Sequence, residues 1–206
     1  MSPRILLTGF EPFNGGDLNS SWAAVRLAAA SAIPGVDLHT QLLPCVFGAA
    51  GEVLWDAVEL LDPDVVIAVG QAGGSTGLAI ERVAVNLDDA TAPDNAGVQP
   101  VDRPIEPDGP VGYFATIPVR ECVAAVRATG VPAAVSDSAG RFVCNHVMYG
   151  LLHRAATRRP GRLVGGFVHV PFAPEQVLDS ARPCLPSSTV AIGLRAVAAR
   201  AARAAG

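Results

Sequence analysis

Charged residues are scarce in this chain, and the acids slightly outnumber the bases. Only 17% of the 206 residues are Asp, Glu, Lys or Arg, and the formal net charge is −4. Half of the residues are hydrophobic, which provides ample material for a buried core and does not fit a disordered chain. Because a basic surface is missing, nucleic acid is excluded as an expected partner.

Long apolar runs and closely spaced cysteine pairs are missing too. No run reaches the ~20 residues of a membrane-spanning helix, so no membrane partner is expected. Residues 1–9 become polar too early for a signal peptide. The four cysteines, Cys45, Cys122, Cys144 and Cys184, form no Cys-x-x-Cys pair, which argues against a zinc ribbon or a redox dithiol. We therefore expect a cytoplasmic protein that holds no metal and keeps its thiols reduced.

What the sequence does contain is an alternation of strand-like and helix-like runs. The expected strands cover residues 4–8, 38–43, 65–69, 82–86, 114–117, 133–136 and 163–170. The expected helices cover residues 21–32, 49–61, 119–129, 145–158, 175–181 and 190–204. This alternation predicts a three-layer α/β fold with a mostly parallel central sheet, and the length suits one domain over residues 1–206.

The carboxyl ends of the predicted strands are where a ligand is expected. In open α/β sheets, ligands bind beyond those ends, which nominates the loops after Thr8, Val69, Ser136 and Val170. The segment 87–112 is a further candidate because it is crowded with Pro, Asp and Gly. A loop of that length inside a compact domain is usually functional or mobile.

Cys144 is the strongest candidate for chemistry. It follows a turn at Gly140 and directly precedes a predicted helix. A helix N-terminus offers unpaired N–H groups and a positive dipole end, which favour the nucleophilic thiolate and can hold an oxyanion. The alternative is a buried structural cysteine, which is the common state of a free thiol.

A cysteine nucleophile needs a base, and His169 is the best placed of the four histidines. It lies at the end of an apolar strand, whereas His146 is two residues from Cys144 and cannot face it on a helix. His169 could instead be a core histidine bonded to a backbone carbonyl. Glu81 is an ionisable residue in an apolar strand, so a partner is expected for it, either His169 or a structural partner such as Arg82.

Two loops have two interpretations each. The glycine-rich segment Gly70–Gly77 could cradle phosphate, or it could be a tight turn that lets another segment approach closely. It lacks the spacing of a dinucleotide fingerprint and the Lys-Ser/Thr of a P-loop. Phe10 and Phe13 stand in the predicted N-terminal loop, where they could line an apolar pocket or simply cover the end of the sheet.

Several motifs in order resemble the pyroglutamyl peptidase I family, also called pyrrolidone-carboxylate peptidases. The resemblance runs from about residue 5 to residue 177. It rests on these segments: Leu6-Leu-Thr-Gly-Phe-Glu-Pro-Phe13, Val69-Gly-Gln-Ala-Gly-Gly74, Glu81-Arg-Val-Ala-Val-Asn86, Pro93-Asp-Asn95, Ser138-Ala-Gly-Arg-Phe-Val-Cys-Asn-His146 and Gly165-Gly-Phe-Val-His-Val-Pro171.

The resemblance implies a cysteine exopeptidase that removes an N-terminal pyroglutamyl residue from peptides through a thioester. Its triad maps onto Cys144, His169 and Glu81. The residues that would contact the substrate ring and its lactam are Phe10, Phe13, Phe142, Val143, Asn19 and Gln71. The resemblance also implies an α/β/α sandwich around a mixed, mostly parallel sheet, a homotetramer, and no cofactor.

Four positions depart from the family pattern. Ser75 and Thr91 stand where arginine is usual, Arg141 replaces a common threonine, and Ala79 replaces Ser or Thr. Arg141 could substitute for a missing arginine. Three alternatives stay open: a cysteine amidase of shifted specificity, a protein that has lost catalysis through Ser75 and Thr91, and a non-catalytic module that binds phosphate or nucleotide at Gly70–Gly77.

Overall fold

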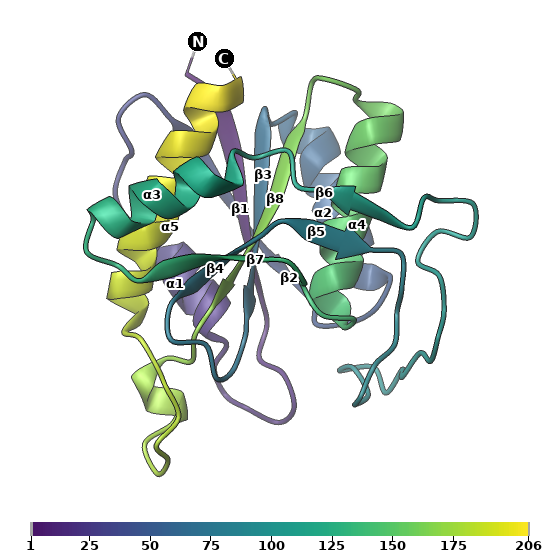
Figure 1. Cartoon of the computed structure of the whole chain (residues 1–206), viewed down its shortest axis with the longest axis horizontal. Helices are drawn as coiled ribbons and strands as arrows, with labels where there is room; N and C mark the ends of the chain where they lie inside the picture. Colours follow the sequence, from purple (N-terminus) through teal and green to yellow (C-terminus); the bar gives the residue numbers. More distant parts are fainter. Residues whose placement is uncertain (1, 206) are drawn as a thin grey trace.

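The computed structural model describes residues 2–205 and has a six-stranded sheet at its centre (Figure 1). The strand order is β2-β1-β3-β8-β4-β7. Neighbouring strands are parallel, except that β4 runs antiparallel to β8. The strands are β1 (Arg4–Phe10), β2 (Asp37–Leu43), β3 (Val65–Gln71), β4 (Leu78–Glu81), β7 (Ala133–Ser136) and β8 (Val164–Val170).

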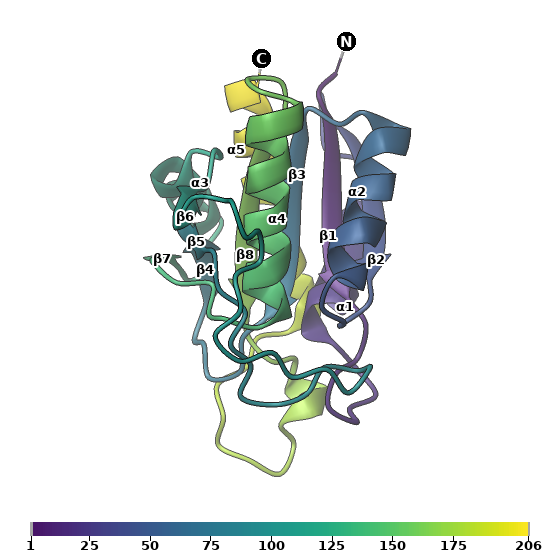
Figure 2. The same cartoon turned by 90° about the vertical axis from the view of Figure 1, so that its right-hand side faces the viewer.

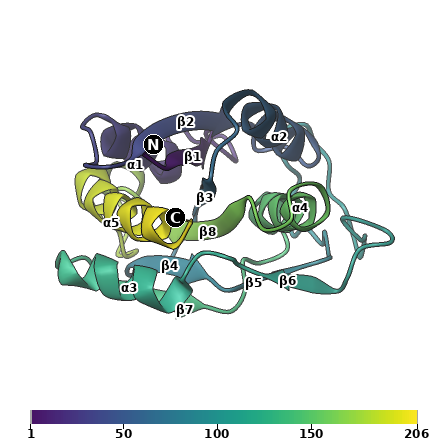
Figure 3. The same cartoon turned by 90° about the horizontal axis from the view of Figure 1, so that it is seen from above.

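Helices cover both faces of this sheet, as Figure 3 shows. One face carries α1 (Ser20–Ala29), α3 (Val119–Ala128) and α5 (Ser187–Ala205), with α5 packed against both of the others. The other face carries α2 (Ala49–Leu61) and α4 (Val143–Arg158). The expected three-layer sandwich around a mixed, mostly parallel sheet is confirmed.

The central strands are apolar on both sides because each side faces a helical layer. In β3, Val65, Ile67 and Val69 join the core under α1, α3 and α5, while Val66 and Ala68 join the core under α2 and α4. A strand buried on both faces shows a continuous apolar run rather than alternation. This packing accounts for the run that predicted the strand.

The predicted strand over residues 82–86 is wrong in its bounds, because the chain leaves the main sheet at Arg82. β5 (Val83–Val85) instead pairs antiparallel with β6 (Gly112–Phe114) in a separate two-stranded sheet. The Arg82 backbone donates to Ser136 O at 2.7 Å and accepts from Ala115 N at 2.9 Å. These two bonds turn the chain from one sheet into the other, and β6 ends where the predicted strand over residues 114–117 was to begin.

The predicted helix over residues 175–181 is also wrong. Only a short 3-10 turn, η1 (Pro174–Gln176), forms there. The Ser180 hydroxyl donates to Val177 O and accepts from Arg182 N, and such local bonds compete with a helix.

The long segment between β5 and β6 passes the N-terminal end of α4 (Figure 2), whereas the segment that follows β8 lies apart from it, on the side of α1 and α5 (Figure 1). Two asparagine side chains fix the course of the long segment by hydrogen-bonding to its backbone. The fully buried Asn145 accepts from Val85 N at 3.0 Å and donates to Val85 O and Leu87 O. Asn86 accepts from the backbone N–H groups of Ile105 and Glu106 at 2.8 and 2.9 Å.

We expect Asn145→Ala to destabilise the fold. The substitution removes the side-chain partners of Val85 N and Leu87 O, two part-buried backbone groups, at a cost of about 1–3 kcal/mol each. Val85 O keeps its bond from Leu87 N. Urea unfolding would show a lower midpoint at an unchanged slope. Gln99→Ala, which removes one bond from an exposed side chain of the same segment to Ala90 O, is the matched control and should unfold close to wild type. Equal midpoints for all three proteins would contradict this role of Asn145.

Candidate active site

Three neighbouring strands bring Gly70, Glu81 and His169 onto one face of the sheet. Gly70 of β3 pairs with His169 of β8, which also pairs with Ala79 of β4, and Glu81 pairs with Phe167. Paired residues share a face, and so do residues two apart along a strand. Glu81 and His169 are therefore diagonal neighbours under α4, within reach of a long side chain.

Glu81 and His169 form a buried pair. Glu81 Oε1 lies 2.8 Å from His169 Nδ1, and the two residues are 1% and 8% exposed. The Phe167 ring packs against the imidazole with centroids 4.8 Å apart. Arg82, the alternative partner of Glu81, instead pairs with Asp137 at 2.9 Å. The carboxylate thus orients the imidazole and leaves Nε2 for a second partner.

The Cys144 sulfur lies within hydrogen-bonding reach of the same ring, next to Gly70, which is the strand partner of His169. Burial lowers the pKa of His169, but the neighbouring Cys144 sulfur and the Glu81 carboxylate raise it more, and the net pKa rises to about 10. A carboxylate beside an imidazole favours the protonated ring. At neutral pH the imidazole therefore carries a positive charge beside the sulfur.

Cys144 is the second residue of α4, directly after Val143 and the N-cap residue Phe142. The first N–H groups of a helix have no partner within it, so they point at whatever binds beside the sulfur. Gly70 makes room for this thiol, because a Cβ at that position would lie 2.7 Å from Sγ and 2.8 Å from the Phe167 ring. The glycine is needed there for close packing and not for an unusual backbone angle.

We expect Gly70→Ala to impair the site. The added methyl group must displace Sγ or the Phe167 ring, and a misplacement of ~1 Å costs about 100-fold in rate. Hydrolysis of a pyroglutamyl amide, the substrate that the resemblance implies, would measure this. Gly150→Ala is the control, because nothing lies within 4 Å of its added Cβ and alanine favours a helix. A Gly70→Ala enzyme as fast as the control would show that Sγ tolerates displacement.

An aromatic group lies beside the N-terminus of α4. Phe142 contacts Phe13 and Phe47 at centroid distances of 5.0 and 5.2 Å. Phe10 does not stand in a loop as expected, but is the last residue of β1 and 2% exposed, and Val143 is fully buried. Phe47 was not predicted from the sequence, although it lies in the loop after β2, which begins at the same carboxyl edge of the sheet as the nominated loops.

Asn19 and Gln71, the two residues expected to bond the substrate lactam, differ in how accessible their side-chain amides are to a ligand. Asn19 caps α1, accepting from Ser21 N and Ser21 Oγ and donating to Glu11 O. Gln71 ends β3 and lines a cavity of about 520 Å³ together with Phe13, Phe172, Gln176 and Arg182, among others. Gln71 is thus the one of the two with access to a ligand.

In the glycine-rich segment after β3, neighbouring side-chain and backbone atoms fill the space beside Gly73 and Gly77. A Cβ on Gly73 would lie 2.3 Å from the Phe172 ring, and one on Gly77 would lie 2.5 Å from Pro132 O. Close approach accounts for glycine at these positions without a phosphate. This favours the tight-turn interpretation of the segment over the phosphate cradle.

Arg141 is held by Asp89 through an ion pair, and its backbone oxygen accepts from Asp89 N. Its guanidinium is therefore tied to the start of the long segment. Ala79 is the direct strand partner of His169 and offers the ring no hydroxyl.

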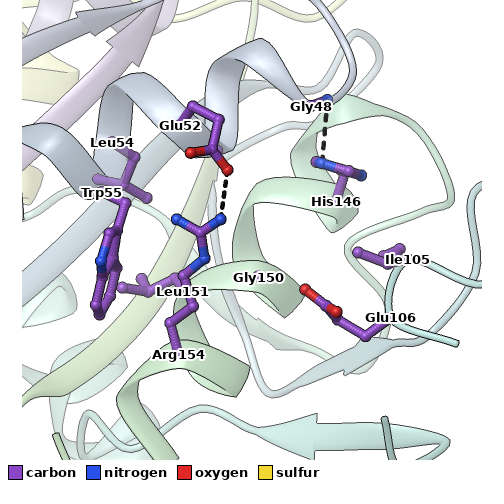
Figure 4. A pocket seen from close by; sticks show the side chains of 11 residues that line it. Gly48, Glu52, Leu54, Trp55, Ile105, Glu106, His146, Gly150, Leu151 and Arg154 are labelled. Atoms are coloured by element: carbon purple, nitrogen blue, oxygen red, sulfur yellow. Dashed lines mark hydrogen bonds and ion pairs between the residues drawn. The ribbon is translucent and has the colours of Figure 1, made fainter. Parts of the chain in front are cut away.

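A second histidine–acid pair lies away from the sulfur, beside a cavity of about 190 Å³ between α2 and α4 (Figure 4). His146 Nδ1 is 2.8 Å from Asp88 Oδ2, and His146 Nε2 accepts from Gly48 N at 3.1 Å. Both ring nitrogens are occupied, so His146 is not the base for Cys144. An ion pair between Arg154 and Glu52 borders the same cavity.

Within residues 2–205, no three His, Cys, Asp or Glu side chains are grouped as metal ligands. No helix in that part of the chain combines the length and hydropathy needed to cross a bilayer.

A family model described as pyroglutamyl peptidase matches residues 3–205. The chain belongs to the pyroglutamyl peptidase family. Among curated relatives of this peptidase, the pyrrolidone-carboxylate peptidase of Streptomyces coelicolor is 56% identical over 97% of the chain and 92% of the relative. That of Chromobacterium violaceum is 55% identical over 84% of the chain and 80% of the relative.

Solved structures agree with this assignment. Pyroglutamyl peptidase I of Bacillus amyloliquefaciens superposes with a TM-score of 0.93 at 42% identity, covering 98% of this chain and 97% of its own. A pyrrolidone carboxyl peptidase variant from Pyrococcus furiosus superposes with a TM-score of 0.91 at 37% identity, covering 96% and 97%. The chain thus shares both its sequence family and its fold with these peptidases.

Proposed function

We propose that this family member is a cysteine exopeptidase that hydrolyses the bond after an N-terminal pyroglutamyl residue. The observation that carries the proposal is the arrangement around His169, with Glu81 bonded to Nδ1 at 2.8 Å and the Cys144 sulfur within hydrogen-bonding reach of the ring. A nucleophile, a base and an acid that orients the base are the parts required for acyl transfer. The names of the relatives supply the substrate class.

In the first half of the reaction, the Cys144 sulfur attacks the carbonyl carbon that links the pyroglutamyl residue to the next amino acid. The oxygen of that carbonyl becomes an oxyanion, which the backbone N–H of Cys144 and a second donor stabilise at the start of α4. The His169 imidazolium then gives its proton to the departing amine. The products are a free shortened peptide and a thioester on Cys144.

In the second half, the now neutral imidazole takes a proton from water, and the resulting hydroxide attacks the thioester. Pyroglutamate leaves, and the sulfur and the protonated ring are restored. Glu81 holds the Nδ1 proton in place through both steps and stabilises the positive ring. The enzyme is proposed to need no cofactor and to act in the cytoplasm as a homotetramer.

Substrate recognition requires an apolar contact for the flat ring and polar contacts for its lactam. Phe13 and Phe142 supply aromatic surface beside the helix start, and Gln71 supplies an amide on the neighbouring cavity. A site built to bond a substrate amide rejects analogues that lack the group more strongly than an apolar slot can.

Amine release from a fluorogenic pyroglutamyl amide tests the proposal, with and without prior alkylation by iodoacetamide. We expect turnover that alkylation removes, and much slower turnover of the matching prolyl amide, which lacks the ring carbonyl. Equal turnover of the two amides would indicate a cysteine amidase of shifted specificity. Turnover of neither would refute the proposed function.

The charge on His169 can be measured directly as a function of pH. Because its pKa is raised to about 10, the ring of the free enzyme should stay protonated through pH 7–8 and lose its proton only above that range. Carbon-13 chemical shifts of the labelled imidazole report this. In Glu81→Gln one of the negative neighbours is gone, so the midpoint should move to lower pH. A ring that titrates near 6.5 in both proteins would contradict the raised pKa.

A further inference from the structure

The loop over residues 44–48, between β2 and α2, is held by side chains from three other segments. Each of them accepts a backbone N–H of the loop, at 3.0, 2.9 and 3.1 Å respectively: Glu11 from Cys45, Asp94 from Phe47 and His146 from Gly48. The long segment adds a fourth bond, from Asn95 N to Cys45 O at 3.1 Å. The loop has no strand or helix of its own, so these bonds determine its course.

The ring of Phe47 carries this loop into the aromatic group beside α4. It meets Phe142 edge-on, with centroids 5.2 Å apart and an angle of 83° between the rings, and Phe142 in turn contacts Phe13. Phe142 is the N-cap residue of α4, two residues before Cys144. The three rings and Cys144 are partly buried and pack against the same core, the one under α2 and α4. A shift of Phe47 would therefore release one of the two rings that hold Phe142.

Asp94 divides its two carboxylate oxygens between its own turn and this loop. Oδ1 accepts from Ala96 N at 2.9 Å and from Val98 N at 2.8 Å, and both donors belong to the long segment. Oδ2 accepts from Phe47 N at 2.9 Å. Asp94 is only 5% exposed, and a buried carboxylate is tolerated only where such bonds offset its lost hydration. One oxygen thus shapes the turn, and the other reaches across to the loop.

We propose that Asp94 is a positioning residue that holds Phe47 against Phe142, so that the aromatic group is already assembled when the pyroglutamyl ring arrives. The inference rests on the proposed function for the identity of the ring. It gives the long segment a part in substrate binding that needs no contact with the substrate. A side chain fixed before binding loses less conformational freedom when the ligand binds, which increases affinity.

Asp94→Asn tests this, because asparagine keeps the shape but has one acceptor oxygen and one NH₂ group. The oxygen should keep the two bonds inside the turn, which leaves the NH₂ group facing Phe47 N, donor against donor. We expect KM for a pyroglutamyl amide to rise about 3–10-fold, the cost of ordering one freed side chain on binding. kcat should stay within about twofold, since the contact acts equally in the bound substrate and in the transition state.

Asp64→Asn is the matched control. Asp64 also accepts a backbone N–H from a distant segment, that of Arg4 at 2.7 Å, but it lies at the amino ends of β1 and β3, opposite to the site. It should leave KM and kcat at their wild-type values. The double variant of Asp94→Asn with Phe47→Ala should have the same KM as Phe47→Ala alone, because Asp94 is proposed to act only through Phe47.

Two further measurements separate this role from a purely structural one. The rate at which iodoacetamide inactivates the enzyme should match wild type in Asp94→Asn, because the sulfur and the imidazole are untouched. Protection by free pyroglutamate should need about 3–10-fold more ligand. Should Asp94→Asn not fold, Phe47→Leu replaces it, since leucine removes the aromatic ring but keeps the backbone N–H for Asp94, and the same rise in KM is expected.

The two proposals fail in different ways. A wild-type protein that does not cleave pyroglutamyl amides refutes the proposed function. Active wild-type enzyme with a lower thermal midpoint but unchanged KM and unchanged protection in Asp94→Asn overturns the positioning role alone, because Asp94 would then only stabilise its turn. Additive losses in the double variant would likewise show that Asp94 does not act through Phe47.

Discussion

Cys144→Ala is expected to lower kcat for a pyroglutamyl amide by about 10⁶-fold, to the limit of detection. Removing the nucleophile of a triad leaves only the catalysis that the oxyanion donors and substrate binding provide. The fold should persist, because Cys144 lies at the helix start and is only partly buried. A continuous fluorescence assay over hours at high enzyme concentration measures the residual rate.

Cys184→Ala is the matched control for this variant. Its thiol is also free and partly buried, but it lies in the segment after β8 and not beside the imidazole. We expect full activity and retained sensitivity to iodoacetamide. Loss of activity in Cys184→Ala with retained activity in Cys144→Ala would show that Cys184, and not Cys144, is the nucleophile.

Glu81→Gln is expected to lower kcat by about 10⁴-fold at most, with little change in the fold. The substitution is isosteric but removes the charge that stabilises the protonated His169, and it allows the ring to adopt the wrong tautomer. Loss of the charge also lowers the pKa of His169, so the folded state gives up the stability that the protonated ring contributes near neutral pH. The thermal midpoint should therefore fall somewhat while activity falls much further.

Asp88→Asn is the control with the same geometry. Asp88 also lies 2.8 Å from a histidine Nδ1, that of His146, but the other nitrogen of that ring already accepts from Gly48 N. Its activity should stay within a few-fold of wild type. If Asp88→Asn lost as much activity as Glu81→Gln, the base would have to be sought at His146.

The sequence predicted most of the central sheet and helices because their apolar patterns are local. The runs in β3 and β8 are continuous, and Asn19, the N-cap of α1, is one of the residue types that favour that position. The same patterns nominated Cys144 from its position at a helix start. These features depend on neighbours within a few residues, which is the range that a pattern records.

What the sequence alone could not determine depends on strand register and on distant backbone groups. The choice of His169 over Arg82 as partner of Glu81 follows from β4 lying antiparallel beside β8, a pairing that no local pattern encodes. Gln176 was expected on a helix, yet its amide is held by Leu18 O, 158 residues away in the chain. Phe47 went unnoticed because only its packing against Phe142 distinguishes it.

The pairing of β4 with β8 has a consequence for how this protein can change over evolution. Side chains alternate between the two faces of a strand, so one residue inserted or deleted between Leu78 and Glu81 would turn the carboxylate toward the opposite helical layer. β7 could not compensate, because it lies on the other side of β4. Insertions and deletions should therefore accumulate in the connections before Leu78 and after Arg82, while the number of residues from Leu78 to Glu81 stays at four.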